Sequence, residues 1–225
     1  MVAPRTAGHR GRIVPGMLVA IAGGHGQIAL RLTRLLSERG DEVRSLIRNP
    51  DHADDIRDAG GDPVVCDLEE ADDALVANAV RGADAVVFAA GAGPGSGSQR
   101  KGTMDLGGAV KLIAAAKAGG IRRYVMVSSI NADPNHPGED TFSIYLRAKG
   151  EADAELAASG LDYTIVRPGP LTNDPGTGRV QLDAGRGDVT RDDVAAVLAA
   201  VIHEPGTIGR TFDLSGGDTP IDEAL

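Results

Sequence analysis

Two residues in the segment SIYLRAKGEA, residues 143–152, could carry acid–base chemistry. Tyr145 and Lys149 are four residues apart in a helical pattern, which puts their Cβ atoms about 5–6 Å apart on one face. A nearby ammonium group favours the ionised phenol, so this tyrosine could donate a proton to a substrate oxygen. Ser129, in the run YVMVSS, could add a second hydrogen bond. The same spacing also fits a helix face with an exposed tyrosine and a solvated lysine.

These residues need a scaffold, and the pattern of apolar runs indicates one. From Leu18 onward, short β-type runs alternate with helical patterns, which predicts an α/β fold with a parallel sheet covered by helices on both faces. The expected strands cover residues 18–22, 42–47, 63–67, 85–90, 124–129, 163–168 and 211–215. The expected helices between them cover residues 26–40, 51–60, 71–82, 103–120, 142–160 and 190–206.

Composition limits the possible functions. The 225 residues, 42% hydrophobic and 24% charged, suit one folded domain over residues 17–225, after a flexible tail over residues 1–16. A net charge of −9 argues against nucleic acid and anionic membranes as partners. No apolar run has the length of a membrane helix, and we expect a cytoplasmic protein with a small-molecule substrate, either monomer or homodimer. We read the single cysteine, Cys66, as a small buried hydrophobe, and no metal-ligand cluster appears.

A glycine-rich loop, VAIAGGHGQIALRL, joins the first strand to the first helix. Gly23, Gly26 and Ala29 are three residues apart, a spacing that allows a tight turn, a close approach to a pyrophosphate and close packing of helix on strand. This context predicts a dinucleotide site, with phosphates held by amide hydrogens and the helix dipole. The expected contacts in the loop are Gly23, Gly24, His25, Gly26, Gln27 and Ile28. We assign His25 a shape or hydrogen-bonding role, not that of a base.

The end of the second strand indicates which dinucleotide binds. Dinucleotide folds that prefer NAD carry an acidic residue there, but this chain has RSLIRNP with Arg48 at that position. A guanidinium pairs well with a 2′-phosphate, so we expect NADP(H) as the cofactor and NAD(H) as the less favoured one. Asp67, which closes the third strand, is a candidate contact to the adenine amino group.

Two longer connections, residues 91–102 and 130–141, follow the ends of strands, where ligands bind in open α/β sheets. His136 lies in the second and is a candidate substrate contact, although a surface histidine in a flexible loop would look the same.

Together, the glycine loop, LIRNP, FAAGAG, VMVSS, Tyr145 with Lys149, and VRPGPL resemble an extended or atypical short-chain dehydrogenase/reductase over residues 17–225, most of all its small NAD(P)-binding subgroup. The resemblance implies a seven-stranded Rossmann-type sheet, a cofactor across the carboxyl ends of the strands, and a Ser-Tyr-Lys site. It assigns roles to further residues: Asp67, Leu68, Ala89, Ala90 and Gly91 on the adenosine side, Lys149 at the cofactor, Ser129 as the catalytic serine, and Pro168, Gly169 and Leu171 flanking the nicotinamide. The family's third loop glycine is replaced by Ala29, and the C-terminal substrate region is short.

Three functions follow as hypotheses. The first is an NADP(H)-dependent oxidoreductase acting on a small carbonyl or alcohol. The second is a cofactor-binding sensor without turnover, and retention of the Ser, Tyr and Lys together counts against it. The third is a nucleotide-sugar epimerase or dehydratase, which the short C-terminal region disfavours. The substrate itself is not readable from the sequence.

Overall fold

The computed structural model describes residues 16–91, 93 and 97–225. Residues 1–15 of the expected tail lie outside the described residues. The central element is a nine-stranded sheet with the order β11-β8-β10-β6-β5-β4-β1-β2-β3. Helices cover both faces, so the predicted α/β, Rossmann-type architecture is confirmed.

Seven adjacent strands of this sheet are parallel and correspond to the seven predicted from the sequence. They are β1 (Leu18–Ala22), β2 (Glu42–Ile47), β3 (Asp62–Val65), β4 (Ala85–Phe88), β5 (Arg123–Val127), β6 (Asp162–Pro168) and β10 (Arg210–Gly216). Because they are parallel, all seven end at the same edge of the sheet. The loops that follow β1, β2, β4, β5 and β6 therefore meet there.

The prediction of a seven-stranded sheet is wrong by two strands. β8 (Arg179–Leu182) pairs antiparallel with β10, and β11 (Thr219–Pro220) pairs antiparallel with β8. A separate two-stranded parallel sheet joins β7 (Leu171–Thr172) to β9 (Val189–Thr190). These strands have two to four residues each, too few to give a clear alternation of apolar and polar positions.

The predicted helical segments are present except for a change in the middle of the chain, and further short helices lie at residues 98–100 and 221–224. The helices are α1 (Gln27–Arg39), η1 (Pro50–His52), α2 (Ala53–Asp58), α3 (Asp73–Ala79), α4 (Ser98–Arg100), η2 (Lys101–Gly108), α5 (Ala109–Ala118), α6 (Thr141–Ala158), α7 (Arg191–His203), η3 (Pro205–Thr207) and α8 (Ile221–Ala224). The helix predicted over residues 103–120 is in fact a π-helical segment, η2, followed by α5. Two consecutive glycines, Gly107 and Gly108, end the π-helical segment.

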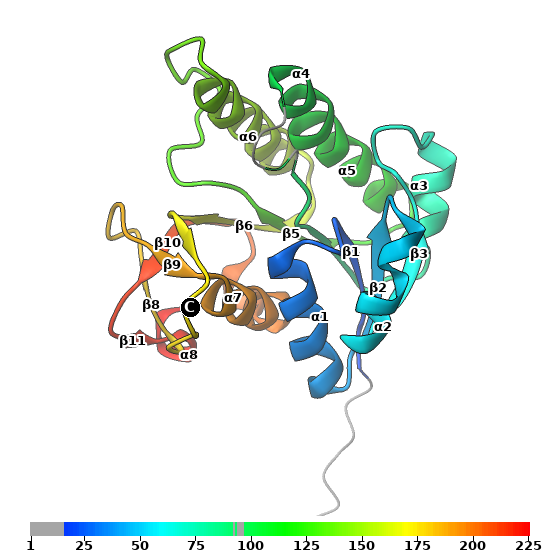
Figure 1. Cartoon of the computed structure of the whole chain (residues 1–225), viewed down its shortest axis with the longest axis horizontal. Coiled ribbons are helices and arrows are strands. Elements are labelled where there is room, and N and C mark those ends of the chain that lie inside the picture. The colour runs from blue at the N-terminus through cyan, green and yellow to red at the C-terminus, as the bar shows by residue number, and fades with distance from the viewer. Residues whose placement is uncertain (1–15, 92, 94–96) are drawn as a thin grey trace, which may run out of the picture.

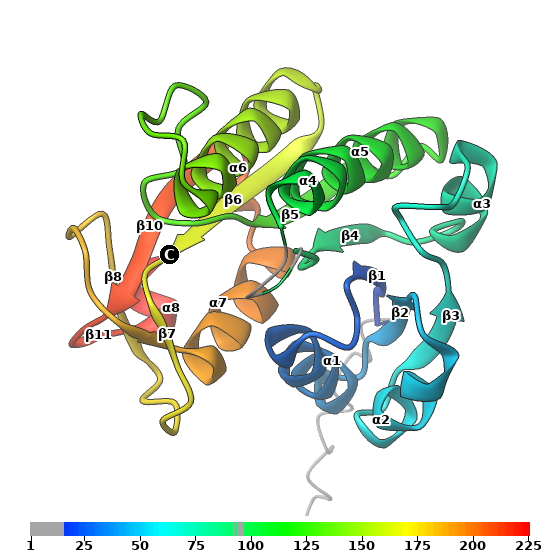
Figure 2. The same ribbon diagram turned by 45° about the horizontal axis from the view of Figure 1, so that its top comes forward.

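Two apolar cores lie on opposite faces of the sheet. On one face α3, α5 and α6 pack against residues such as Phe88, Tyr124 and Met126. On the other face α1 and α7 pack against Val19, Ile21 and their neighbours. Figures 1 and 2 show α5 and α6 on one side of the strands and α1 and α7 on the other. No helix in the described ranges has the length and apolar character needed to cross a membrane.

A buried arginine ties the edge of the sheet opposite the ligand edge to α7. Arg123, at the start of β5, is 8% exposed. Its guanidinium donates to the carbonyl of Asp162 at 2.8 Å, to the hydroxyl of Thr164 at 2.8 Å and to the carbonyl of Val201. Burial lowers the pKa of this guanidinium. The side chain thus satisfies backbone groups at the end of α7 that have no partner within that helix.

We therefore predict that Arg123→Met lowers the free energy of unfolding by about 2–3 kcal/mol, because buried carbonyl and hydroxyl groups lose their donor. Urea denaturation followed by circular dichroism measures the change. The neighbouring Arg122 is a matched control, since its side chain is 67% exposed and pairs with Asp162 at the surface. Arg122→Met should cost much less. Equal losses for the two variants would contradict the role given to Arg123.

Candidate functional site

The glycine loop makes a tight turn against the two neighbouring strands. Gly23 has a φ of +80°, and a Cβ atom there would lie 2.6 Å from the Cα of Ala90. The Gly24 amide donates to the carbonyl of Leu46 at 2.9 Å, and the Gly26 amide donates to the carbonyl of Gly23 at 2.9 Å. The loop is thus hydrogen-bonded to β2 and lies against Ala90, just after β4, with no room for a side chain at Gly23.

Helix α1 begins directly after this turn. Gly26 is the N-cap and supplies no side chain to the first amide hydrogens of α1. Ala29, one turn later, is fully buried against β1, so a small residue is needed there. Gln27 and Ile28 form the first turn of the helix. Amide hydrogens and a helix dipole of this kind bind anionic groups such as phosphate.

A cleft of about 300 Å³ extends from the glycine loop across the ends of β2, β3 and β4. It brings together nine of the residues predicted to bind the cofactor: Gly23, His25, Gly26, Arg48, Asp67, Leu68, Ala89, Ala90 and Gly91. It is also lined by His52, Cys66, Arg100 and Met104, for which the sequence reasoning proposed no ligand contact. Burial raises the pKa of the Cys66 thiol, which fits its expected place as a small buried side chain.

The wall of the cleft formed by β2 carries basic side chains. Arg48 is exposed at the end of β2 and lines the cleft. The rings of His25 and His52 are stacked, with centroids 3.6 Å apart and planes 15° apart. The Nε2 atom of His25 lies 2.7 Å from an Oδ2 atom of Asp55 on α2. His25 is thus bonded to α2, and His52 is a neighbour that the sequence reasoning did not name.

The wall formed by residues 67–71 is held in place by a lysine. Lys111 of α5 donates to the carbonyls of Leu68 at 2.9 Å, Glu69 at 3.3 Å and Ala71 at 2.8 Å. Asp67 accepts from the amide of Glu69 at 3.0 Å, so one of its oxygens is used within this turn. The cleft wall is therefore fixed by contacts within the protein.

An ion pair joins this wall to the helices beyond β4. Arg100 donates through Nη2 to a carboxylate oxygen of Glu69 at 2.5 Å, and Thr103 donates to the other oxygen at 2.6 Å. The hydrogen bond from Arg100 holds the pKa of Glu69 below its usual range. Glu69 is therefore ionised at neutral pH and connects both sides of the cleft.

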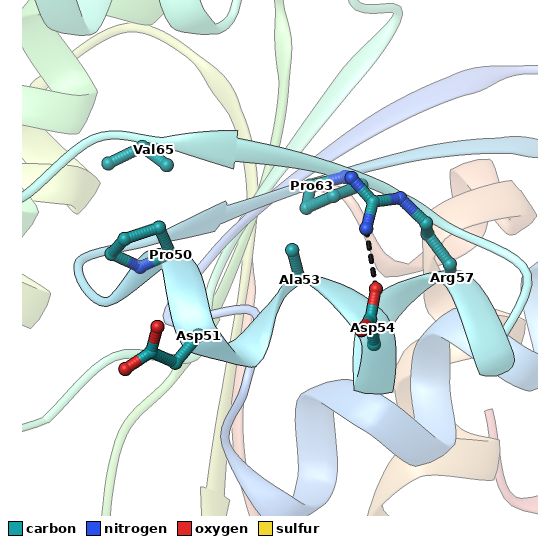
Figure 3. Close-up of a pocket in the computed structure, with 7 residues that line it drawn as sticks. All are labelled: Pro50, Asp51, Ala53, Asp54, Arg57, Pro63 and Val65. Atoms are coloured by element: carbon teal, nitrogen blue, oxygen red, sulfur yellow. Dashed lines mark hydrogen bonds and ion pairs between the residues drawn. The ribbon is translucent and has the colours of Figure 1, made fainter.

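A second hollow, of about 550 Å³, lies behind η1 and α2 against the edge strand β3 (Figure 3). Its lining is Pro50, Asp51, Ala53, Asp54, Arg57, Pro63 and Val65. Arg57 in this hollow is bonded to Asp54 at 2.7 Å, and the lining offers neither glycine-loop amides nor an acid–base pair. The candidate site is therefore the smaller cleft at the strand ends.

Tyr145 and Lys149 lie on α6, at the same edge of the sheet. The Nζ atom of Lys149 is 5.9 Å from the centroid of the Tyr145 ring and donates to the carbonyl of Val127, the last residue of β5, at 3.1 Å. The Lys149 side chain is only 4% exposed, whereas Tyr145 is half-buried. The predicted couple thus has a buried cation beside an accessible phenol ring.

Two charged residues of η2 complete this group, and sequence reasoning missed both. Asp105 is fully buried, and its Oδ1 atom lies 3.5 Å from the Nζ of Lys149. Lys101 is 8% exposed, donates to the carbonyl of Gly93 at 3.0 Å, and has its Nζ 5.0 Å from the centroid of the Tyr145 ring. A π-helical turn directs both side chains toward α6. The available signal was a lysine and an aspartate four residues apart in an otherwise small and apolar stretch.

Ser129 follows β5, two residues after the carbonyl that Lys149 binds. Its Oγ atom donates to the carbonyl of Ile130 at 3.2 Å, and no hydrogen bond joins it to Tyr145 among the described residues. Its neighbour Ser128 points inward and donates to Asp153 at 2.8 Å. Burial raises the pKa of Asp153, opposed by Arg167 at 2.8 Å. Of the two serines, Ser129 is the one that is partly exposed.

The remaining predicted residues lie farther along the same edge. Pro168 ends β6, and Gly169 donates its amide to the carbonyl of Leu214 at 2.9 Å while a Cβ atom on it would collide with the carbonyl of Gly187. Leu171, in β7, is 36% exposed. His136 binds the carbonyl of its own neighbour, Pro137, at 2.9 Å. Among the described residues, no hydrogen bond or ring contact links His136 to Tyr145.

The residues present fit a dinucleotide. The cleft offers a backbone turn without side chains for a pyrophosphate, a cation at the end of β2, and a carboxylate at the end of β3. In the described part of the chain, no group of three His, Cys, Asp or Glu side chains lies close enough together to bind a metal ion. What the arrangement can do chemically is bind a nucleotide and exchange a proton at Tyr145.

We predict that Gly23→Ala removes dinucleotide binding, because the added methyl group would lie 2.6 Å from the backbone of Ala90 and distort the turn. Titration with NADPH, followed by cofactor fluorescence, should show at least a tenfold loss of affinity.

Gly82 gives the control for backbone strain alone. Its φ is +76°, close to that of Gly23, but a Cβ atom there would meet nothing within 4 Å. Gly82→Ala should cost about 1 kcal/mol of stability and leave NADPH affinity unchanged. If Gly23→Ala also bound NADPH normally, the turn would not be the phosphate site.

Comparison with known proteins agrees with this geometry. The family described as NAD(P)H-binding matches residues 23–205. The uncharacterized sugar epimerase YhfK of Bacillus subtilis is 42% identical over 212 residues, which cover 93% of this chain and 99% of that protein.

Two solved structures show the same fold. A protein of Bacillus halodurans described as an NAD-dependent epimerase/dehydratase is 42% identical, with a TM-score of 0.85, and the match covers 92% of this chain and 97% of that one. The oxidoreductase ylbE of Lactococcus lactis is 27% identical, with a TM-score of 0.81 and coverage of 92% and 94%.

Proposed function

Because the chain belongs to the NAD(P)H-binding family and is of the atypical short-chain dehydrogenase/reductase type, we propose that it is an NADP(H)-dependent oxidoreductase. Its substrate is a small carbonyl compound or alcohol. One observation carries the proposal: the buried ammonium of Lys149 lies beside the ring of Tyr145 at the strand edge where the nucleotide cleft opens. The similar oxidoreductase of Lactococcus lactis supports the reaction class.

The cofactor preference rests on Arg48. It lines the cleft at the end of β2, where NAD-preferring proteins of this architecture have an acidic residue. A guanidinium there forms charge-assisted hydrogen bonds with a 2′-phosphate, which only NADP(H) carries. Asp67 would contact the adenine, and the loop from Gly23 to Ile28 would hold the pyrophosphate.

The chemistry divides between cofactor and protein. The nicotinamide, when bound, supplies or accepts the hydride. Tyr145 donates the proton to the substrate oxygen during reduction, and Ser129 gives that oxygen a second hydrogen bond. Lys149 stabilises the phenolate left on Tyr145, since a buried cation favours an adjacent anion. Pro168, Gly169 and Leu171 would flank the nicotinamide. We propose that this reaction takes place in the cytoplasm.

A cofactor-binding sensor without turnover is the second candidate, and one observation favours it. The Lys149 ammonium already donates to the carbonyl of Val127 and forms an ion pair with the carboxylate of Asp105, 3.5 Å away. A lysine held in this way could serve structure alone. The accessible phenol of Tyr145 is the reason that we favour the enzyme.

The epimerase hypothesis gains some weight from the relatives. The Bacillus subtilis protein described as a sugar epimerase matches this chain over 99% of its length. Its C-terminal region is therefore about as short as the one in this chain. The short C-terminal region is therefore a weaker objection than the sequence suggested. A sugar nucleotide remains the less favoured substrate here.

We predict that Arg48→Ala weakens NADPH binding about ten- to a hundredfold and leaves NADH binding unchanged, because one charge-assisted hydrogen bond is lost. Fluorescence titration of both cofactors measures the two affinities. Arg57→Ala is the control. This substitution removes the same charge, but from the hollow of Figure 3, which lies outside the cleft. An unchanged NADPH affinity in Arg48→Ala would remove Arg48 from this role.

Turnover tests the tyrosine. A screen of small carbonyl compounds for NADPH oxidation identifies a substrate, and Tyr145→Phe should then lower kcat on the order of a hundredfold to ten thousandfold with NADPH affinity unchanged. Tyr163→Phe is the matched control, since Tyr163 lies in β6 and packs against the core. Normal turnover by Tyr145→Phe would favour another acid. A chain that binds NADPH but oxidises it with no carbonyl compound would favour the sensor.

A further inference from the structure

The stacked histidines beside Arg48 have no part in the chemistry described so far. His25 comes from the loop after β1 and His52 from η1, so two separate segments converge to bring the rings within 3.6 Å. Both rings are half-buried, and both line the same cleft as Arg48. The end of the cleft at β2 therefore holds three basic side chains.

The neighbouring elements η1 and α2 carry acidic side chains near these rings. On α2, Asp55 accepts or shares the Nε2 proton of His25 at 2.7 Å. Asp51 and Asp54 line the hollow of Figure 3, and Asp54 is paired there with Arg57 at 2.7 Å.

The other side of the cleft presents one cation and two acids. Arg100 and Asp67 both line the cleft, but Arg100 is bonded to Glu69. Its charge is thus largely balanced within the protein, and Arg48 is the remaining guanidinium at the end of β2. The only acidic group bonded to the histidine pair among the described residues is Asp55.

A phosphate beside the stack would interact with the charge that imidazole rings carry when they are protonated. Imidazole is the side chain that ordinarily gains its charge between pH 8 and pH 5. With both rings protonated, two positive charges would lie 3.6 Å apart and repel each other. A phosphate dianion close to both rings would offset that repulsion. Binding of such a group would therefore draw a proton from solution onto the pair.

We propose that His25 and His52 form a proton-dependent clamp for the 2′-phosphate of NADP(H), with His52 a specificity-determining residue beside Arg48. This inference rests on the proposed preference for NADP(H). The phosphate accepts hydrogen bonds from the protonated imidazoles, and the proton comes from solvent with no change of oxidation state. Affinity for NADP(H) then rises as the pH falls, while affinity for NAD(H), which lacks the phosphate, does not.

The test compares NADP⁺ and NAD⁺ binding to the full chain by isothermal titration calorimetry at about pH 8 and about pH 7, both above the range around pH 6 where the phosphate itself becomes protonated. Uptake of up to one proton changes the dissociation constant by at most about tenfold per pH unit. We expect NADP⁺ to bind about three- to tenfold more tightly at the lower pH, and NAD⁺ to change by less than about twofold. Titrations in two buffers of different ionisation enthalpy should show proton uptake for NADP⁺ alone.

His52→Gln should abolish the pH dependence and the proton uptake for NADP⁺. His203→Gln is the control, since His203 contacts Asp41 at 2.8 Å at the opposite edge of the sheet, and it should keep both. A pH-independent NADP⁺ affinity in the wild-type protein, or an unchanged pH dependence in His52→Gln, would overturn the clamp. Because Arg48→Ala tests the preference for NADP(H) separately, loss of the clamp with the Arg48 effect intact leaves the proposed function standing.

Discussion

The part of the strand edge that carries Tyr145 is organised around one buried cation. The Lys149 ammonium joins three elements, because it donates to the last carbonyl of β5, pairs with Asp105 of η2, and extends from the helix that carries Tyr145. An ammonium in an apolar interior is costly unless its hydrogen bonds are satisfied, so these partners cannot be altered independently. The position of α6 relative to the strand edge depends on that set of contacts.

The nucleotide side depends on a different constraint, the absence of side chains. The turn at Gly23 lies so close to Ala90 that the backbone itself forms the floor of the cleft. Side chains that can carry charge line the rest of the cleft, among them Arg48, Asp67 and Arg100. The close-packed backbone turn would therefore position the pyrophosphate of a dinucleotide, and the side chains elsewhere in the cleft would contact its other groups.

Much of this arrangement could be predicted from sequence, for identifiable reasons. Most of the seven parallel strands are rich in apolar residues, and the glycine loop and Tyr145 with Lys149 depend on local spacing alone. The two extra strands at the C-terminal edge are too short to show periodicity. Asp105 and His52 were missed because their importance comes from long-range contacts, with Lys149 and His25, that no local pattern encodes. The π-helical turn of η2 was likewise hidden in an ordinary helical pattern.

Lys111 has a consequence for the kinetics of any ligand that enters the cleft. By binding three carbonyls of the turn at Leu68–Ala71, it gives this wall its final shape during folding. The entropy lost in ordering that turn is therefore already lost before a ligand arrives, and it does not reduce affinity. A wall assembled in advance also requires no rearrangement at the moment of contact, so encounter and docking, not loop closure, would set the association rate on this side.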